Sequence, residues 1–131
     1  AIKISSVSDE SVSLYDTHDP CAVGEDTEYL LEVTNNNLNE ITNAVVIYEI
    51  TDEMRPISGA GPTISAIKRN QVIFEPISVF FPGVKLIYKV KFRAIQKGNS
   101  QCAVFIKYDQ CAKALIIGQE GTSVYETSDS K

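Results

Sequence analysis

Hydrophobic and polar residues alternate one by one along most of the chain, and this period of two predicts β-strands. The clearest run is "PGVKLIYKVKFRA" (82–94), which begins after a Pro-Gly turn. Lys85, Ile87, Lys89, Lys91 and Arg93 are expected to face outward, because side chains on one strand point alternately to its two faces. The predicted buried face of this strand consists of Val84, Leu86, Tyr88, Val90, Phe92 and Ala94.

Similar alternation predicts further strands, separated by Pro-, Gly- and Asn-containing breaks. They are expected at 11–16, 27–35, 42–51, 70–75, 101–109 and 112–126. Val12 and Leu14 should point one way and Tyr15 the other. The predicted inward residues of the next two strands are Tyr29, Leu31, Val33, Val46, Tyr48 and Ile50. About seven short strands at this spacing predict an all-β, immunoglobulin-like β-sandwich with no helix longer than a turn or two.

Composition is consistent with one compact domain. The 131 residues are 44% hydrophobic, enough for a substantial core, which we expect over about 10–126. The formal charge of −5 argues against nucleic-acid binding, which normally needs a basic surplus. No apolar run approaches the roughly 20 residues that span a bilayer. The polar ends "AIKISS" and "ETSDSK" resemble cuts in linkers, so we expect 1–131 to be a single domain excised from a longer, multi-domain protein.

No motif for catalysis or cofactor binding stands out, and we expect neither enzymatic activity nor a cofactor. His18 and Cys21 are close in sequence, but no third group is apparent that would orient a Cys-His pair. The acids Asp16, Asp19, Glu25 and Asp26 cluster near one connection and form a weak calcium candidate, since Ca²⁺ prefers oxygen ligands. Their spacing matches no known calcium loop, and acidic turns are usually just solvated.

The only basic cluster is the outward stripe of Lys85, Lys89, Lys91 and Arg93. A stripe of this kind would be able to contact a polyanion or an acidic partner face. The simpler interpretation, which we favour, is a solvated strand face or a lysine-protected sheet edge.

Two segments carry a family resemblance. "VGEDTEYLLEVTNNNLNEITNAVV" contains a Gly-acid turn, a Val-Thr-Asn strand end and a Thr-Asn that opens the next strand. "FFPGVKLIYKVKFRAIQKG" contains the Pro-Gly turn, the long strand and a trailing Gly. Together they resemble the conserved repeat domain of bacterial and archaeal cell-surface proteins, an immunoglobulin-like sandwich. "HDPCAVGEDTEY", "DEMRPISGAGPT" and "GTSVYE" are similar to the large cysteine-rich proteins of the chlamydial outer membrane complex.

This resemblance implies a structural module of a cell-envelope protein, in the periplasm, the outer membrane or at the cell surface. Its partners would be sibling domains of the same chain and other envelope proteins, joined in part by intermolecular disulfides, with membrane contact only through the parent protein. Envelope rigidity would come from domain packing and these cross-links. The alternative is an adhesin or ligand-binding module that uses the basic stripe, and a third option is a calcium-stabilised surface repeat.

The cysteines number three and fit no zinc pattern. In an immunoglobulin-like sandwich, Cys21 and Cys102 are expected at the same end, so we predict a disulfide between them. By closing the loop between them, this disulfide would stabilise the folded state by roughly 4–5 kcal/mol in the chain-entropy model. Cys111 is expected at the opposite end, free or bonded to a neighbouring protein. The alternative is three unpaired cysteines, two of them simply buried.

The asparagines at 35–37 are expected to turn the chain through left-handed φ angles and side-chain bonds to their own backbone.

Overall fold

The computed structural model describes residues 12–127 and contains eleven β-strands in two facing sheets. No helix in this part of the chain is long and apolar enough to cross a membrane. The strands are β1 (Val12–Asp16), β2 (Cys21–Ala22), β3 (Asp26–Thr34), β4 (Ile41–Ile50), β5 (Met54–Ala60), β6 (Ser65–Lys68), β7 (Gln71–Phe74), β8 (Ile77–Phe80), β9 (Lys85–Ala94), β10 (Gly98–Lys107) and β11 (Leu115–Tyr125).

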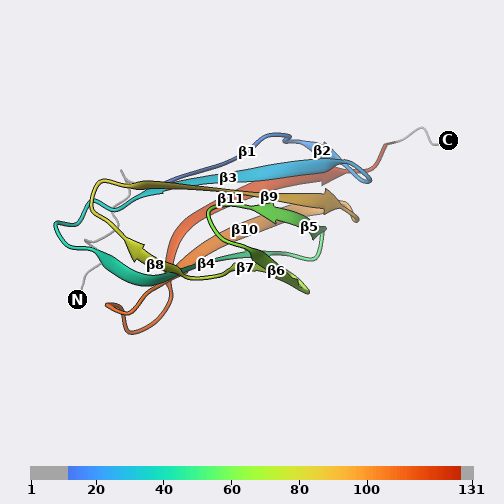
Figure 1. Cartoon of the computed structure of the whole chain (residues 1–131). Coiled ribbons are helices and arrows are strands. Elements are labelled where there is room, and N and C mark those ends of the chain that lie inside the picture. Colours follow the sequence, from blue (N-terminus) through green and yellow to red (C-terminus); the bar gives the residue numbers. More distant parts are fainter. Residues whose placement is uncertain (1–11, 128–131) are drawn as a thin grey trace.

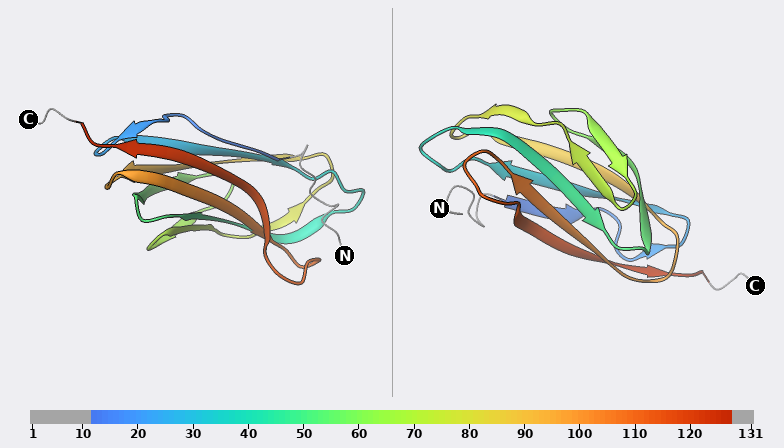
Figure 2. Two further views of the ribbon diagram at one scale, coloured as in Figure 1. Left: turned by 180° about the vertical axis from the view of Figure 1, so that it is seen from behind. Right: turned by 90° about the horizontal axis from the view of Figure 1, so that it is seen from below.

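The smaller sheet has the order β1-β3-β9-β5, and the larger has the order β2-β11-β10-β4-β7-β6. β8 pairs with the first half of β4, while β7 pairs with its second half. The two layers lie face to face along one long axis (Figure 1). β11 runs between β10, which is antiparallel to it, and the short parallel strand β2 (Figure 2). This arrangement confirms the predicted all-β, immunoglobulin-like sandwich.

The core lies between the sheets and is built around buried aromatic rings. Phe92 meets Tyr29 of its own sheet edge-on, with ring centroids 5.6 Å apart, and Tyr48 of the opposite sheet at 6.5 Å. Phe74 and Tyr88 form a second edge-on pair at 4.8 Å. Offset and edge-on geometries suit aromatic quadrupoles, so these contacts hold the sheets at a defined spacing. The predicted inward faces of β3, β4 and β9 are buried as expected, with one exception.

Val84 is that exception: its side chain is 40% exposed. It lies in the turn before β9, where its amide nitrogen donates to the Phe81 carbonyl oxygen at 3.2 Å. The strand therefore begins at Lys85, one residue later than the alternation predicts. The prediction for Val84 was wrong because a tight turn hydrogen bond replaces the strand geometry there.

Four strands were missed in the sequence: β2, β5, β6 and β8. β5 carries Pro56 and a bulge between Pro56 and Ser58, features that hide alternation and suit an edge strand. β2 is only two residues long, and β8 lies between two prolines. These strands extend the edges of the sandwich and do not change its class.

The asparagine-rich connection between β3 and β4 turns by a different device from the one predicted. Among non-glycine residues 12–127, positive φ occurs at Asn43 and Arg69, and at none of the asparagines 35–37. Asn35 is instead fully buried, and its Oδ1 accepts a hydrogen bond from the Asn37 amide at 2.8 Å. The expected side-chain bond to the local backbone is thus present, while the expected left-handed φ is not.

Strands β1 and β11 place the described chain's two ends at opposite ends of the long axis (Figure 1). Val12 pairs with Val33, close to the turn that precedes β9. Tyr125 pairs with Ala22 at the other end, where the Gly24 amide donates to the Ala94 carbonyl at the end of β9. The chain therefore runs into the sandwich at one end and out of it at the other.

Candidate functional site

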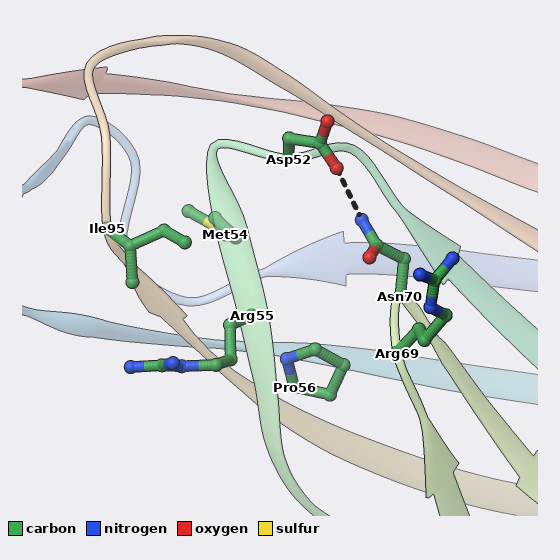
Figure 3. Close-up of a pocket in the computed structure, with 7 residues that line it drawn as sticks. All are labelled: Asp52, Met54, Arg55, Pro56, Arg69, Asn70 and Ile95. Carbon is green, nitrogen blue, oxygen red and sulfur yellow. Dashed lines mark hydrogen bonds between the residues drawn. The ribbon is translucent and has the colours of Figure 1, made fainter.

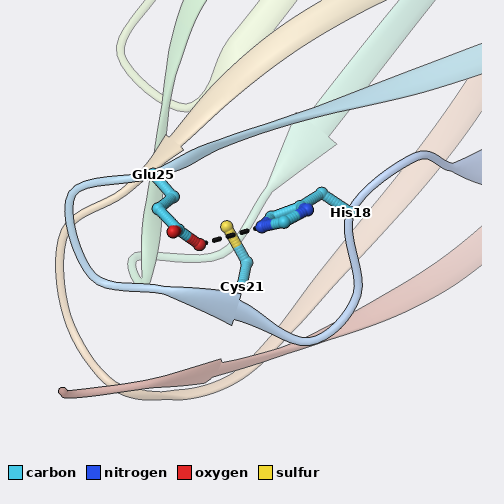
Figure 4. Close-up of side chains that lie close together, drawn as sticks. All are labelled: His18, Cys21 and Glu25. Atoms are coloured by element: carbon cyan, nitrogen blue, oxygen red, sulfur yellow. Dashed lines mark hydrogen bonds and ion pairs between the residues drawn. The ribbon is translucent and has the colours of Figure 1, made fainter.

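The connection from β1 through β2 to β3 brings three chemically distinct side chains together. The ring Nε2 of His18 lies 2.8 Å from Glu25 Oε1. The Cys21 sulfur lies within 4.8 Å of a nitrogen of this ring and of an oxygen of this carboxylate. Figure 4 shows the three side chains directed toward a common point. Cys21 is fully buried, whereas the side chains of His18 and Glu25 are 48% and 50% exposed. The group therefore joins a buried thiol to two surface groups.

Local backbone bonds hold this corner in place. Gly24 has φ +96°, a left-handed conformation suited to glycine, and it turns the chain so that Glu25 comes back over Cys21. The Glu25 amide donates to the Ala22 carbonyl at 2.9 Å, and the Ala22 amide donates to Glu25 Oε1 at 3.0 Å. On the other side, the His18 amide donates to Thr27 Oγ1 at 3.0 Å. These bonds define where the imidazole and the carboxylate meet.

Acidic residues surround this corner and make its electrostatic potential negative. The Ala22 amide and then the His18 ring hold the pKa of Glu25 below its usual value. Burial raises the pKa of the Cys21 thiol, and Glu25, Asp26, Asp19 and Asp16 raise it further, in that order. The surroundings of the thiol therefore keep it protonated.

The four acids of the calcium candidate do not converge, because each has its own partner. Asp16 Oδ2 accepts from Thr122 Oγ1 at 2.6 Å, and Asp19 Oδ1 accepts from the Ser123 amide at 3.0 Å. Asp26 is bound by the Arg93 guanidinium, which lowers the pKa of that carboxyl. Only Glu25 belongs to the group of closely spaced metal-ligating atoms found within residues 12–127. The arrangement does not support the calcium candidate.

The three cysteines are all free thiols in the structure, so the expected Cys21–Cys102 disulfide is not present. Strand register gives the physical reason. Cys21 and Gly98 lie opposite Val124 on the two sides of β11, and Cys102 lies four residues further along β10. Two strand spacings across and four residues along separate their Cα atoms by about 16 Å. A disulfide needs less than about 7 Å, so these two thiols cannot pair in this fold.

Thiol reactivity should therefore differ sharply among the cysteines. Cys21 and Cys102 are buried, and burial together with Asp16 and Glu120 raises the pKa of the Cys102 thiol. Cys111 is only partly buried, in the loop between β10 and β11. We expect a thiol reagent at neutral pH to label about one cysteine per folded chain and all three in denaturant. Cys111→Ser should abolish labelling of the folded chain. Labelling of Cys102 as fast as that of Cys111 would contradict the predicted difference in accessibility.

The loop that carries Cys111 is tied to the start of β4 by polar contacts. Asp109 Oδ2 accepts from Thr42 Oγ1 and from Asn43 Nδ2, both at 2.8 Å. The Thr42 amide donates to Gln110 Oε1 at 3.1 Å. The Cys111 sulfur lies 3.2 Å from both the amide and the carbonyl of Tyr108. The thiol is therefore held at a defined place, at the end of the sandwich opposite Cys21, as predicted.

The basic stripe on β9 is largely matched by acids on β3. Arg93 makes a two-pronged contact with Asp26 at 2.8 and 3.2 Å, and Lys85 Nζ lies 3.3 Å from Glu32 Oε1. Lys91 is directly opposite Glu28 in register, whereas Lys89 is opposite Leu30. Three of the four cations thus face an acidic residue, and exposed pairs of this kind contribute little stability. This pairing favours the solvated strand face over the polyanion site.

One surface pocket of about 570 Å³ lies beside β5 and the β6–β7 turn. It is lined by Asp52, Met54, Arg55, Pro56, Arg69, Asn70 and Ile95. Figure 3 shows the Arg55 and Arg69 side chains on opposite sides of Pro56, pointing away from each other. The side-chain Nδ2 of Asn70 donates to Asp52 Oδ1 at 2.9 Å and to the Ile50 carbonyl oxygen at 2.8 Å, so it is already engaged within the protein. The polar groups do not converge on a ligand position.

Comparison with solved structures agrees with the immunoglobulin-like β-sandwich fold. No protein-family model matches the sequence. A cohesin module from a Clostridium perfringens family 33 glycoside hydrolase aligns over 89% of this chain and 97% of its own, with TM-score 0.60 and 10% identity. A non-cellulosomal cohesin from Archaeoglobus fulgidus aligns over 88% and 86%, with TM-score 0.53 and 12% identity.

A second kind of structural neighbour is a domain within a much longer chain. A Salmonella alpha-2-macroglobulin mutant aligns with 88% of this chain but over only 7% of its own length, with TM-score 0.64 and 16% identity. At these identities the similarities establish the fold alone.

The sequence indicates that chemically reactive side chains gather between β1 and β3, but it does not indicate which of them meet. In the sequence, no third group is apparent beside His18 and Cys21, and Glu25 belongs to the calcium candidate. The spacing His-x₂-Cys-x₃-Glu, broken by a proline and a glycine, was the available signal. It is too short and too common a pattern to stand out before the turn at Gly24 is seen.

Proposed function

We propose that this chain is a non-catalytic structural module of a cell-envelope protein, located in the periplasm, the outer membrane or at the cell surface. Its role is to pack end to end with sibling domains and to engage neighbouring envelope proteins, partly through a disulfide at Cys111. The observation that carries this proposal is the placement of the chain's described ends at opposite ends of a stiff sandwich. A domain whose chain enters at one end and leaves at the other is suited to a serial arrangement with further domains.

Three further features support a mechanical role. The sheets are joined by buried aromatic contacts, which favour a rigid unit over a deformable one. The structural neighbours include modules of larger proteins, a cohesin module of a glycoside hydrolase and a segment of an alpha-2-macroglobulin. Of the three thiols, Cys111 alone is partly open to solvent, so it is the one that a second protein is able to reach without unfolding the domain.

The test compares purified domain and cell envelopes with and without reductant. Under mild oxidation, the wild-type domain should form disulfide-linked dimers, because one thiol per chain is accessible, and Cys111→Ser should abolish them. In the source cells, the parent protein should fractionate with the envelope in reductant-sensitive complexes. Cys102→Ser serves as the control and should leave dimer formation unchanged. Recovery of the parent protein in the cytoplasm, or dimers that persist in Cys111→Ser, would refute the proposal.

A further inference from the structure

The group formed by His18, Cys21 and Glu25 has a chemistry that the structural role proposed above does not use. It offers one imidazole nitrogen, one sulfur and one carboxylate oxygen, with all three ligand atoms within 4.8 Å of one another. Nitrogen, thiolate sulfur and carboxylate oxygen are the ligand types that Zn²⁺ takes in proteins. A set of oxygen ligands is what Ca²⁺ and Mg²⁺ require, and this group supplies only one such residue.

The geometry is close to that of a three-ligand tetrahedral site. Bonds of about 2.0 to 2.3 Å to a tetrahedral ion place ligand atoms roughly 3.3 to 3.8 Å apart. The present 2.8 Å between His18 Nε2 and Glu25 Oε1 is a hydrogen-bond distance, so an ion would replace that bond and open it by roughly half an ångström. Both side chains are half exposed and able to move by this amount. Figure 4 shows the Cys21 sulfur between the Glu25 carboxylate and the His18 ring.

The surroundings of the Cys21 sulfur also favour a cation at this point. The Cys21 thiol is fully buried, yet its strongest protein partner is a weak contact from Sγ to the Ala22 carbonyl at 3.8 Å. The sulfur therefore gives up only this weak contact when it binds a metal ion.

Neither of the other cysteines competes for this sulfur. The register sets Cys102 about 16 Å away across β11. Cys111 follows the far end of β10, at the opposite end of the sandwich. Cys21 therefore remains a free thiol within the domain and is available as a ligand.

We infer that His18, Cys21 and Glu25 form a binding site for a borderline-soft divalent metal ion, with Zn²⁺ the best fit. Before an ion binds, Nε2 carries the proton that Glu25 accepts; on binding, Nε2 gives this proton up to solvent, Nδ1 takes one up, and the neutral His18 ring donates the Nε2 lone pair. Glu25 contributes its carboxylate, and the Cys21 thiol releases one proton to solvent as the sulfur–metal bond forms. A water molecule completes the tetrahedron from the exposed side. The ion joins the β1–β2 connection to the β2–β3 turn and so fastens the short strand β2 to the sandwich.

The experiment uses tag-free, reduced domain, because a polyhistidine tag would bind the same metals. Co²⁺ reports thiolate ligation through a sulfur-to-metal charge-transfer band in the near ultraviolet, and Zn²⁺ should displace it. We expect one Co²⁺ per chain with this band, and a rise in the thermal midpoint with Zn²⁺ but not with Ca²⁺. His18→Ala should weaken Zn²⁺ binding by about 100-fold or more, since even indirect supporting residues are worth 10- to 100-fold.

Matched variants separate this site from other causes. Cys21→Ala should lose the charge-transfer band, while Cys111→Ser should keep it. Asp19→Asn retains the Oδ1 acceptor for Ser123 and removes only a nearby charge, so its affinity should stay within about tenfold of wild type. Because His18 is on the surface, His18→Ala tests the site even if Cys21→Ala fails to fold. No stoichiometric band, an unchanged band in His18→Ala, loss of the band in Cys111→Ser, or stabilisation by Ca²⁺ alone would overturn the inference.

Discussion

Replacing Phe92 by alanine should lower the free energy of unfolding by about 3–5 kcal/mol, the usual cost of truncating a buried aromatic side chain. Phe92 is fully buried and touches rings from both sheets, Tyr29 of β3 and Tyr48 of β4. The alanine variant loses the transfer free energy of the ring and leaves a cavity between rigid layers that cannot collapse to fill it. A domain of this size is typically stable by only about 5–15 kcal/mol, so the variant should be close to unfolding.

Equilibrium unfolding in urea measures this directly. The midpoint should fall while the slope stays constant, because the surface exposed on unfolding is nearly unchanged. Phe81→Ala is the matched control: its ring is 54% exposed, so the change should cost much less, about 1 kcal/mol or below. Equal losses from the two variants would contradict the assignment of Phe92 to the centre of the core.

Replacing Asn35 by alanine should cost about 2–4 kcal/mol, which is large for the loss of a small polar side chain. Asn35 is fully buried beneath the β3–β4 connection. Its Nδ2 donates to the carbonyl oxygens of Phe80, at 2.8 Å, and Asn39, at 3.1 Å, while its Oδ1 accepts from the Asn37 amide. Alanine would leave these buried backbone groups without hydrogen-bond partners, and a buried polar group without a partner costs free energy. The connection and the turn before β9 would come apart together.

Two variants make this prediction specific. Asn35→Asp keeps the acceptor for the Asn37 amide but turns a donor into an acceptor facing two carbonyls, so it should be at least as destabilising as alanine. Asn39→Ala removes an exposed side chain from the same connection and should stay within about 0.5 kcal/mol of wild type. If Asn35→Ala were as mild as Asn39→Ala in urea unfolding, the buried hydrogen bonds of Asn35 would contribute little to stability.

Phe92 and Asn35 differ in how well their burial is predictable from the sequence. Phe92 belongs to a ten-residue strand with strict alternation, so its burial was predictable from its neighbours alone. Asn35 lies in a polar connection, and the sequence suggested only a local turn there. Its burial depends on the turn before β9: the Gly83 amide donates to the Asn35 carbonyl at 2.8 Å. No local pattern encodes a contact between segments almost fifty positions apart.

The same distinction holds for the thiols. The sequence predicted that Cys21 and Cys102 would lie at the same end of the sandwich, whereas Cys102 lies midway along β10. Whether they pair depends on register and on which strand lies between them, and β11 lies between them. Likewise, the acids near Cys21 looked like one group in sequence, whereas in the fold they bind four different partners.

By itself, the sequence determined the class of the fold, the buried faces of the long strands and the polar character of the connections, because period-two alternation is a local property of the backbone. Only the tertiary structure decided which side chains from different segments meet: the His18–Cys21–Glu25 group, the β3 acids opposite the β9 cations, and the spacing of the thiols. These depend on register, bulges and one left-handed glycine, where a shift of a single residue moves a side chain to the other face.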